Sequence, residues 1–171
     1  MRLATEVLDK ETLKCYKEEF DGRSKSDTWY SSAFTWHQNL RNGFPGAILQ
    51  SSVSKELFDR VVQCTRDRLP PYKSIHIQHY IWQPYSGITI HRDEPYYYSA
   101  TIYLNEVWAP EFGGLFVWRD SPKDLKWNAI CPTYNTMIIN KSGTEHMVTM
   151  VSPYSYYPRI SLQLRLFDRE I

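Results

Sequence analysis

The chain has 171 residues, enough for one hydrophobic core of ordinary size, and 42% of them are apolar, 23% charged and 15% aromatic. Its 20 basic and 19 acidic side chains give a formal net charge of +1, so nothing in the charge favours nucleic acid or an anionic membrane as a partner. The many aromatic residues and the small net charge also exclude intrinsic disorder.

The first part of the chain is predicted to be mostly helix and loop. Residues 9–20 form a short helix, because an aspartate can cap it and apolar side chains recur at helical spacing. Residues 22–46 have no clear period, and long loops of this kind are usually functional covers or mobile segments. A second, more amphipathic helix follows a serine cap and runs from about residue 54 to residue 69, where two prolines end it.

After the proline pair the sequence consists of short runs with β-type alternation, separated by proline and glycine. These runs are residues 74–82, 87–91, 97–104, 115–118, 136–140, 145–151 and 159–167. At least seven strands without helices between them predict an antiparallel sandwich or barrel, covered on one face by the N-terminal helices. We expect one domain over residues 1–171, in which residues 1–70 support a β core at 74–168.

The closing strand, residues 159–167, shows the clearest alternation. One face carries Ile160, Leu162, Leu164 and Leu166, and the other carries Arg159, Ser161, Gln163 and Arg165. A polar inner face on a strand of a small barrel indicates that the barrel holds something polar.

The cysteines and the N-terminus bear on the compartment. Cys15, Cys64 and Cys131 are odd in number and widely spaced, which argues against a disulfide scaffold and a zinc ribbon. Acidic residues interrupt the first eleven positions, unlike a signal peptide, and no run approaches the roughly 18 apolar residues of a membrane span. We therefore expect a cytoplasmic protein with free thiols.

Two histidines and one carboxylate could hold a metal ion. His91 and Asp93 share one face of an extended strand, because residues i and i+2 project to the same side. The His-x-Asp pattern alone is a weak signal and is more often a surface histidine beside a solvated aspartate. His146 opens a later strand, however, and two histidines with one carboxylate form a facial triad with open positions, the pattern of non-haem Fe(II) oxygenases. Arg159, in the closing strand, offers a planar fork for a dicarboxylate co-substrate.

These residues lie in segments that resemble the 2-oxoglutarate and Fe(II)-dependent oxygenase superfamily, in its prolyl-4-hydroxylase-like branch. The resemblance covers Tyr80 to Phe167, about half of the chain, and rests on residues 87–93, 99–105, 112–116, 146–148 and 159–162. It implies a mainly β or α+β fold, a double-stranded β-helix (a jelly-roll, cupin-like barrel) with N-terminal supporting helices.

The resemblance also implies roles for single residues. His91, Asp93 and His146 match the catalytic iron ligands, and Arg159 matches the basic residue that binds the remote carboxylate of 2-oxoglutarate. Ser161 lies beside Arg159 on the same strand face.

Several further residues have competing interpretations. Tyr80 stands where the family often places a tyrosine that hydrogen-bonds the same carboxylate, but a packed strand aromatic is the alternative. Thr101 and Tyr103, on the next strand, are weaker candidates. Arg165 is the alternative anchor. It lies six residues beyond Arg159, roughly 20 Å along an extended strand, so both arginines cannot serve one co-substrate. The position of Arg159 after the distal histidine, His146, favours Arg159 as the residue that binds the co-substrate.

The remaining histidines are predicted to be structural. His76 and His79 are three residues apart on one strand, so they face opposite sides and cannot share an ion without a bulge. His37 is predicted to be a loop residue.

The resemblance implies an oxidoreductase, a dioxygenase that uses Fe(II), 2-oxoglutarate and O₂, with ascorbate as an optional further reductant. An intact Asp93 predicts hydroxylation or desaturation, because related halogenases replace this carboxylate with a small residue. The substrate stays open among a free amino acid, a peptidyl proline and another small metabolite, and the oligomeric state is open too. The alternatives are a non-catalytic, cupin-like binding module and a cupin dioxygenase that needs no 2-oxoglutarate. The complete set of three ligands and Arg159 favours the oxygenase over both.

Overall fold

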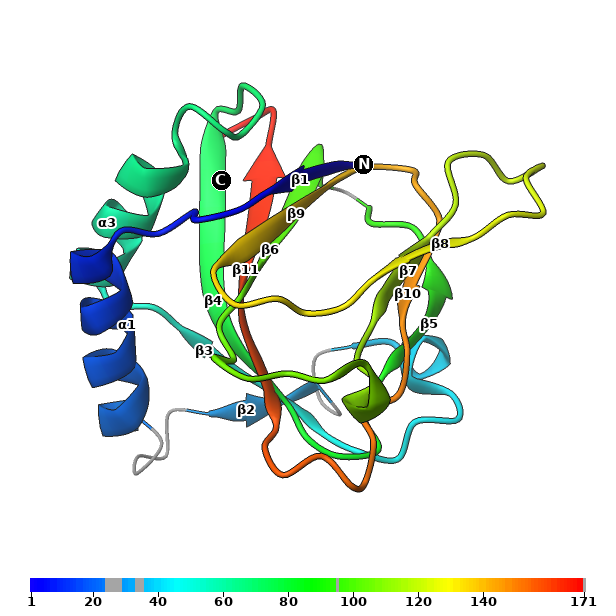
Figure 1. Ribbon diagram of the computed structural model, residues 1–171. Coiled ribbons are helices and arrows are strands. Elements are labelled where there is room, and N and C mark those ends of the chain that lie inside the picture. The colour runs from blue at the N-terminus through cyan, green and yellow to red at the C-terminus, as the bar shows by residue number, and fades with distance from the viewer. Residues whose placement is uncertain (24–28, 33–35, 95, 171) are drawn as a thin grey trace.

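The computed structural model describes residues 1–23, 29–32, 36–94 and 96–170 (Figure 1). Two helices, α1 (Lys10–Arg23) and α3 (Lys55–Thr65), lie side by side against one face of the larger of two sheets. Both begin where the sequence predicts, because the Asp9 carboxylate accepts from the Thr12 amide at 2.7 Å and the Ser54 hydroxyl accepts from the Leu57 amide at 3.2 Å.

Helix α3 is shorter than predicted. It ends at Thr65, four residues before the expected end at Leu69. The Thr65 carbonyl accepts from the amides of both Arg68 and Leu69, at 2.9 and 3.0 Å, so the chain closes a tight turn before the proline pair.

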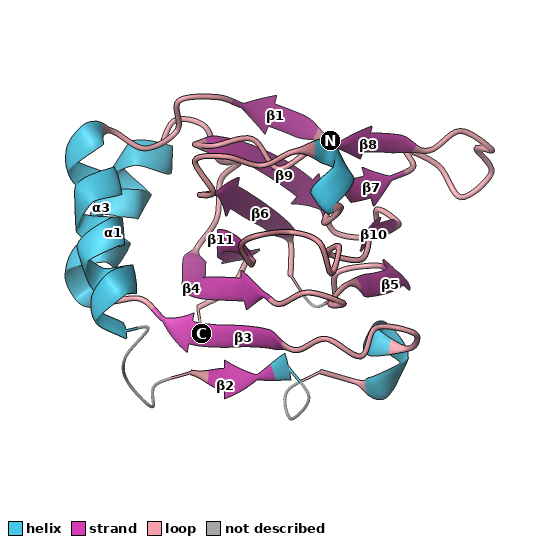
Figure 2. Cartoon of the chain, turned by 60° about the horizontal axis from the view of Figure 1, so that its bottom comes forward, coloured by secondary structure: helices cyan, strands magenta, loops and turns pink. Residues whose placement is uncertain are grey.

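The described strands form two antiparallel sheets that face each other across a barrel (Figure 2). The larger sheet has the order β1 (Arg2–Ala4), β9 (Thr136–Lys141), β6 (Tyr98–Tyr103), β11 (Arg159–Phe167), β4 (Ser74–Trp82), β3 (Ile48–Ser52) and β2 (Tyr30–Ser31). The smaller sheet has the order β5 (Ile88–His91), β10 (His146–Val148), β7 (Phe116–Trp118) and β8 (Asn128–Ile130). Short 3₁₀ helices lie at Gln38–Arg41 (η1) and Pro110–Phe112 (η2).

All seven predicted strands are present, with ends shifted by a few residues at most. The prediction did not include β1, β2, β3 or β8. The segment Ile48–Ser52 ends in three polar residues, so its local signal for a strand is weak. Its pairing with β4 on one side and β2 on the other buries most of it, and this tertiary context decides its structure. The unpredicted β1–β3 come from the region expected to be helix and loop. Parts of the predicted loop 22–46, residues 24–28 and 33–35, lie outside the described residues.

The larger sheet separates two apolar clusters. One lies between its outer face and the helices, and includes Leu57 and Val61 of α3 with Leu162 and Leu164 of β11. The other lies inside the barrel and includes Tyr80, Trp82, Tyr103, Phe116 and Val148. The alternation predicted for β11 is therefore confirmed, because its leucines face the helices and its polar residues face the interior.

No helix among the described residues is long and apolar enough to cross a membrane. Cys15, Cys64 and Cys131 are free thiols, each partly buried, as predicted.

A buried acidic network fastens the helices to the sheet. Glu19 of α1 accepts from the His79 ring on β4 at 2.9 Å, and its two oxygens accept from the Ser54 amide at 2.9 Å and hydroxyl at 2.5 Å. Arg23 adds an ion pair at 2.9 Å. Burial raises the pKa of Glu19, but the hydrogen bonds from His79 and Ser54 outweigh it and lower this pKa to about 2. His79 has the structural role predicted for it.

We expect Glu19→Ala to lower the free energy of unfolding by about 2–4 kcal/mol at pH 7, because it leaves the buried His79 and Ser54 groups without their acceptor. The pKa of Glu19 is lower in the folded than in the unfolded chain. Its charged form therefore stabilises the fold above the unfolded value of about 4.5, and this contribution is lost as pH falls towards 2. The decrease in the free energy of unfolding caused by Glu19→Ala should therefore be about 1 kcal/mol smaller at pH 3.5 than at pH 7.

Urea unfolding at both pH values measures this effect, with Glu18→Ala as the matched control. Glu18 is the preceding residue of α1, and its side chain is 68% exposed. A cost for Glu18→Ala equal to that for Glu19→Ala, or no change between the two pH values, would contradict the assignment.

Candidate metal centre

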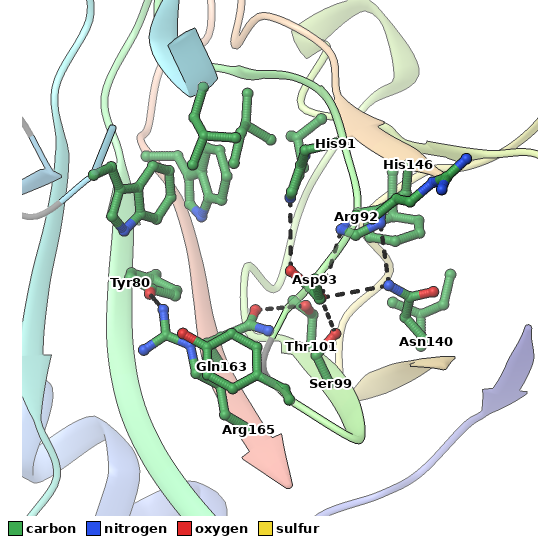
Figure 3. Close-up of a pocket in the computed structure, with 18 of the residues that line it drawn as sticks. Tyr80, His91, Arg92, Asp93, Ser99, Thr101, Asn140, His146, Gln163 and Arg165 are labelled. Carbon is green, nitrogen blue, oxygen red and sulfur yellow. Dashed lines mark hydrogen bonds and ion pairs between the residues drawn. The ribbon is translucent and has the colours of Figure 1, made fainter. Parts of the chain in front are cut away.

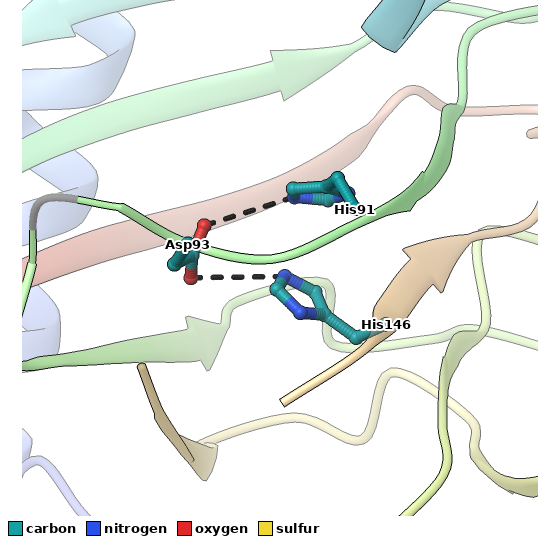
Figure 4. A group of neighbouring side chains, drawn as sticks. All are labelled: His91, Asp93 and His146. Carbon is teal, nitrogen blue, oxygen red and sulfur yellow. Dashed lines mark ion pairs between the residues drawn. The ribbon is translucent and has the colours of Figure 1, made fainter. Parts of the chain in front are cut away.

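Strand register brings the three predicted metal ligands together. His91 ends β5 and lies directly opposite His146, which opens β10. Asp93 follows β5 by two residues and turns its carboxylate towards both rings (Figure 4). The His91 Nε2 atom lies 3.7 Å from Asp93 Oδ1, and the His146 Nε2 atom lies 3.6 Å from Asp93 Oδ2. One candidate ligand atom from each residue lies within 4.8 Å of the other two, so one ion can contact all three.

Backbone carbonyls orient both imidazoles. The Nδ1 atom of His91 lies 2.7 Å from the Thr89 carbonyl oxygen, and that of His146 lies 2.9 Å from the Thr144 carbonyl oxygen. Each ring therefore donates its Nδ1–H and presents the Nε2 lone pair to the centre. Burial lowers the pKa of His91, and the neighbouring His146 lowers it further, so His91 is neutral at pH 7 and able to bind a metal.

Two residues that the sequence analysis missed hold the Asp93 carboxylate. Ser99 of β6 donates to Asp93 Oδ2 at 2.5 Å, and the Asn140 side-chain amide of β9 donates to the same oxygen at 3.4 Å. Ser99 and Asn140 are cross-strand partners, so both point into the barrel. The period-two alternation of β6 and β9 is a signal that could have predicted their direction, but not their contact with Asp93.

The donor set fits a divalent transition metal. Two neutral imidazoles and one carboxylate on one side of an ion are the facial arrangement typical of non-haem Fe(II), and they leave coordination positions open. These positions face a cavity of about 260 Å³, which the three ligands line together with Arg159 and Arg165 (Figure 3).

Arg159 is a buried cation in this cavity, and no acidic side chain in the described part of the chain forms an ion pair with it. Its side chain is 1% exposed, and its guanidinium lies 4.7 Å from the ring centre of Trp82 and 5.0 Å from that of Tyr103. Its Nε and Nη1 atoms have no hydrogen-bond partner among the described residues. Burial lowers the pKa of Arg159, yet a guanidinium stays charged in proteins. Unpaired donors on a buried cation fit a carboxylate ligand.

Tyr80 lies in the cavity wall. Its hydroxyl accepts from Arg165 Nη2 and donates to the Gln50 side-chain oxygen at 3.4 Å, so it is bound to Arg165 and not to Arg159. Ser161 lies between its cross-strand partners Tyr80 and Tyr103. Its hydroxyl is buried without a partner among the described residues, and it is not part of the cavity lining.

Of the two further candidates on β6, Thr101 lines the cavity and donates to the Gln163 side-chain oxygen at 2.8 Å. Tyr103 packs beneath the Arg159 guanidinium. The two arginines of β11 both line the one cavity, although they are six positions apart along the strand. Distance along the strand alone does not predict this.

Part of the predicted loop lines the cavity. The lining residues are Trp36, His37 and, within η1, Leu40, and His37 caps η1 by accepting from the Asn39 amide at 3.3 Å. The other two histidines lie on opposite faces of β4, as predicted. His79 packs under the helices, and His76 pairs with Arg165 across the strands.

Comparisons with known proteins show the fold. No protein-family model and no curated protein matches the sequence. Solved structures do match. A prolyl-4-hydroxylase from Pseudomonas putida has a TM-score of 0.72 at 16% identity, with 99% of this chain and 92% of that chain covered. A prolyl hydroxylase from Trichoplax adhaerens, solved with a peptide fragment of the hypoxia inducible factor oxygen degradation domain, has a TM-score of 0.74 at 16% identity, with 98% and 83% covered.

A third match is an oxidoreductase of the 2OG-Fe(II) oxygenase family from Burkholderia pseudomallei. It has a TM-score of 0.69 at 17% identity and covers 97% of this chain and 83% of that chain. Alignments of nearly full length with three such structures confirm the jelly-roll fold expected from the sequence. The chain therefore has the fold of the prolyl hydroxylases and of the 2-oxoglutarate/Fe(II) oxygenases.

Proposed function

We propose that the protein is a 2-oxoglutarate- and Fe(II)-dependent oxygenase that hydroxylates an unactivated C–H bond. One observation carries the proposal. The ligand atoms of His91, Asp93 and His146 gather within 4.8 Å of one another, in a cavity that Arg159 also lines. Two nitrogen atoms of the Arg159 guanidinium have no hydrogen-bond partner among the described residues. The fold shared with known oxygenases supports it.

The metal ligands, Arg159 and two aromatic residues of the cavity have separate tasks in the proposed reaction. When bound, Fe(II), 2-oxoglutarate and O₂ supply an oxidation that yields succinate and CO₂ and inserts one oxygen atom into a C–H bond. His91, Asp93 and His146 bind the metal from one side and leave the other side to the co-substrate. Arg159 pairs with the remote carboxylate of 2-oxoglutarate in a water-poor site. The rings of Trp82 and Phe116 exclude water around these groups.

The proposal extends to substrate, reductant and compartment. We propose a small-molecule or peptidyl substrate, an amino acid or a prolyl residue included, and ascorbate as an optional reductant. The peptide held by the Trichoplax enzyme supports the peptidyl option. The three free thiols support a cytoplasmic location.

Anaerobic titration separates the proposed function from the two alternatives. Fe(II) with 2-oxoglutarate should give a weak visible charge-transfer band, and a succinate-release screen across amino acids, proline-containing peptides and small metabolites should identify a substrate. A non-catalytic binding module gives no succinate under any condition. A cupin dioxygenase consumes O₂ without needing 2-oxoglutarate, and either result would overturn the proposal.

Gly114 offers a test of Arg159 that keeps its charge. A Cβ atom at Gly114 would lie 2.7 Å from Arg159 Cδ, and the backbone φ there is +63°. We expect Gly114→Ala to displace the guanidinium and to raise the 2-oxoglutarate dissociation constant about tenfold or more, measured by titration of the Fe(II) protein.

Gly43→Ala is the matched control, because Gly43 has a φ of +85° with no atom within 4 Å of the added Cβ. It carries the same kind of backbone strain without crowding Arg159. Equal losses of affinity in the two variants would attribute the effect to strain alone and contradict the prediction.

A further inference from the structure

Arg165 is a second guanidinium in the cavity, and 2-oxoglutarate has no group left for it. The co-substrate has two carboxylates, one for the metal and one for Arg159. We propose that Arg165 binds a carboxylate of the primary substrate, so that the enzyme acts on a small molecule with a free carboxylate rather than on an internal residue of a peptide. This inference rests on the function proposed above.

The sheet register places Arg165 at the level of the metal ligands. It pairs across the strands with Ser99, whose hydroxyl donates to the Asp93 carboxylate. Directly opposed residues of antiparallel strands have Cα atoms about 5 Å apart, and both side chains project to the same face. A molecule that contacts Arg165 therefore lies beside the metal centre, where an oxidised C–H bond must be.

Neutral groups hold the Arg165 side chain in place. Its Nη1 donates to the Gln78 side-chain oxygen at 2.8 Å, and its Nη2 donates to the Tyr80 hydroxyl (Figure 3). Its Cζ atom lies 5.1 Å from the ring centre of Tyr96. Two of the five N–H donors are used in this way, and the side chain is only partly buried. The guanidinium is fixed before a ligand arrives, which lowers the entropic cost of binding.

The charge of Arg165 is not balanced by a nearby acid. No described acidic side chain forms an ion pair with it. Of the carboxylates that line the cavity, Asp93 belongs to the metal, and Glu94 is exposed and makes no ion pair with Arg165. With Fe(II), dianionic 2-oxoglutarate, Asp93 and Arg159 in place, the charges of these four groups cancel. The cation of Arg165 then remains, and a substrate carboxylate would balance it.

The two arginines differ in how deeply they are buried, and this difference indicates which ligand each one binds. Arg159 is 1% exposed, and two of its nitrogen atoms lack partners within the described ranges, which suits the ligand that enters first and lies deepest. Arg165 is more accessible and already has two neutral partners, which suits a ligand that arrives later. The cavity of about 260 Å³ is smaller than the roughly 300–1,000 Å³ of typical ligand pockets, so only a small group can enter it beside 2-oxoglutarate.

Paired ligands that differ only in charge test the proposal. The anaerobic Fe(II)–2-oxoglutarate protein is titrated with free L-amino acids, with their primary amides and with capped proline-containing peptides, and the charge-transfer band reports binding. We expect at least one free acid to bind ten times or more tightly than its amide. Arg165→Gln should remove this preference and change the affinity for 2-oxoglutarate by no more than a few-fold.

Arg92→Gln is the matched control, because Arg92 also lines the cavity but is paired with Glu145 at 2.9 Å. It should keep the preference for the free acid. A wild-type protein that binds no acid more tightly than its amide, or that prefers a capped peptide, overturns the proposal. So does a loss of 2-oxoglutarate affinity above tenfold in Arg165→Gln, which would make Arg165 the co-substrate anchor. Absence of the band in the wild-type protein is a separate result that refutes the oxygenase function itself.

Discussion

His91→Ala and Asp93→Ala are each expected to abolish iron-dependent turnover of 2-oxoglutarate while the protein stays folded. Each substitution removes one of three ligands, and the described part of the chain offers no other group of three or more His, Cys, Asp or Glu side chains able to hold an ion. The two side chains lie at the end of β5 and just beyond it, outside both apolar clusters. Their loss therefore removes metal binding without removing core packing.

Succinate release, bound iron per chain and far-ultraviolet circular dichroism measure the three parts of this expectation. His37→Ala is the matched control, because His37 lies at the same cavity but is not near the triad, and it should keep stoichiometric iron. Undiminished succinate production by His91→Ala or by Asp93→Ala would contradict the assignment of the metal centre.

The alternation of polar and apolar residues explains why so much of the barrel was predictable. In β11, every second residue packs against the helices, so the pattern reports which face is buried. The same rule placed His91 and Asp93 on one side and separated His76 from His79. A strand such as β3 has no such pattern, because even its polar residues Gln50 and Ser51 are buried.

Contacts between side chains from distant strands could not be predicted from the sequence. Ser99 and Asn140 are unremarkable polar residues until register places them together and the turn after β5 brings Asp93 to them. The meeting of Arg159 and Arg165 in one cavity depends on side-chain direction, whereas sequence spacing measures only distance along the strand. The hydrogen bond from Arg165 to the Tyr80 hydroxyl is another such contact, and no spacing in the sequence predicts it.

Arg159→Ala should raise the dissociation constant of 2-oxoglutarate by roughly two to three orders of magnitude. The Arg159 side chain is 1% exposed, and its Nε and Nη1 atoms have no partner among the described residues, so in the complex it and the remote carboxylate form a pair shielded from water. Removing one partner of such a pair costs about 3–5 kcal/mol, because the other charge stays desolvated and alone. A tenfold change in affinity corresponds to about 1.4 kcal/mol, which gives the expected range.

Titration of the Fe(II) protein with 2-oxoglutarate measures this effect, and Arg165→Ala is the internal control. The control should change the dissociation constant of 2-oxoglutarate by no more than a few-fold. In the unsubstituted protein the Arg165 guanidinium is held by neutral partners, and we propose that it binds a different ligand. Iron affinity should change little in either variant, since neither arginine belongs to the triad. If Arg165→Ala loses affinity for 2-oxoglutarate and Arg159→Ala binds it almost normally, then Arg165 and not Arg159 binds the remote carboxylate. If neither substitution weakens binding, 2-oxoglutarate is not the co-substrate of this cavity.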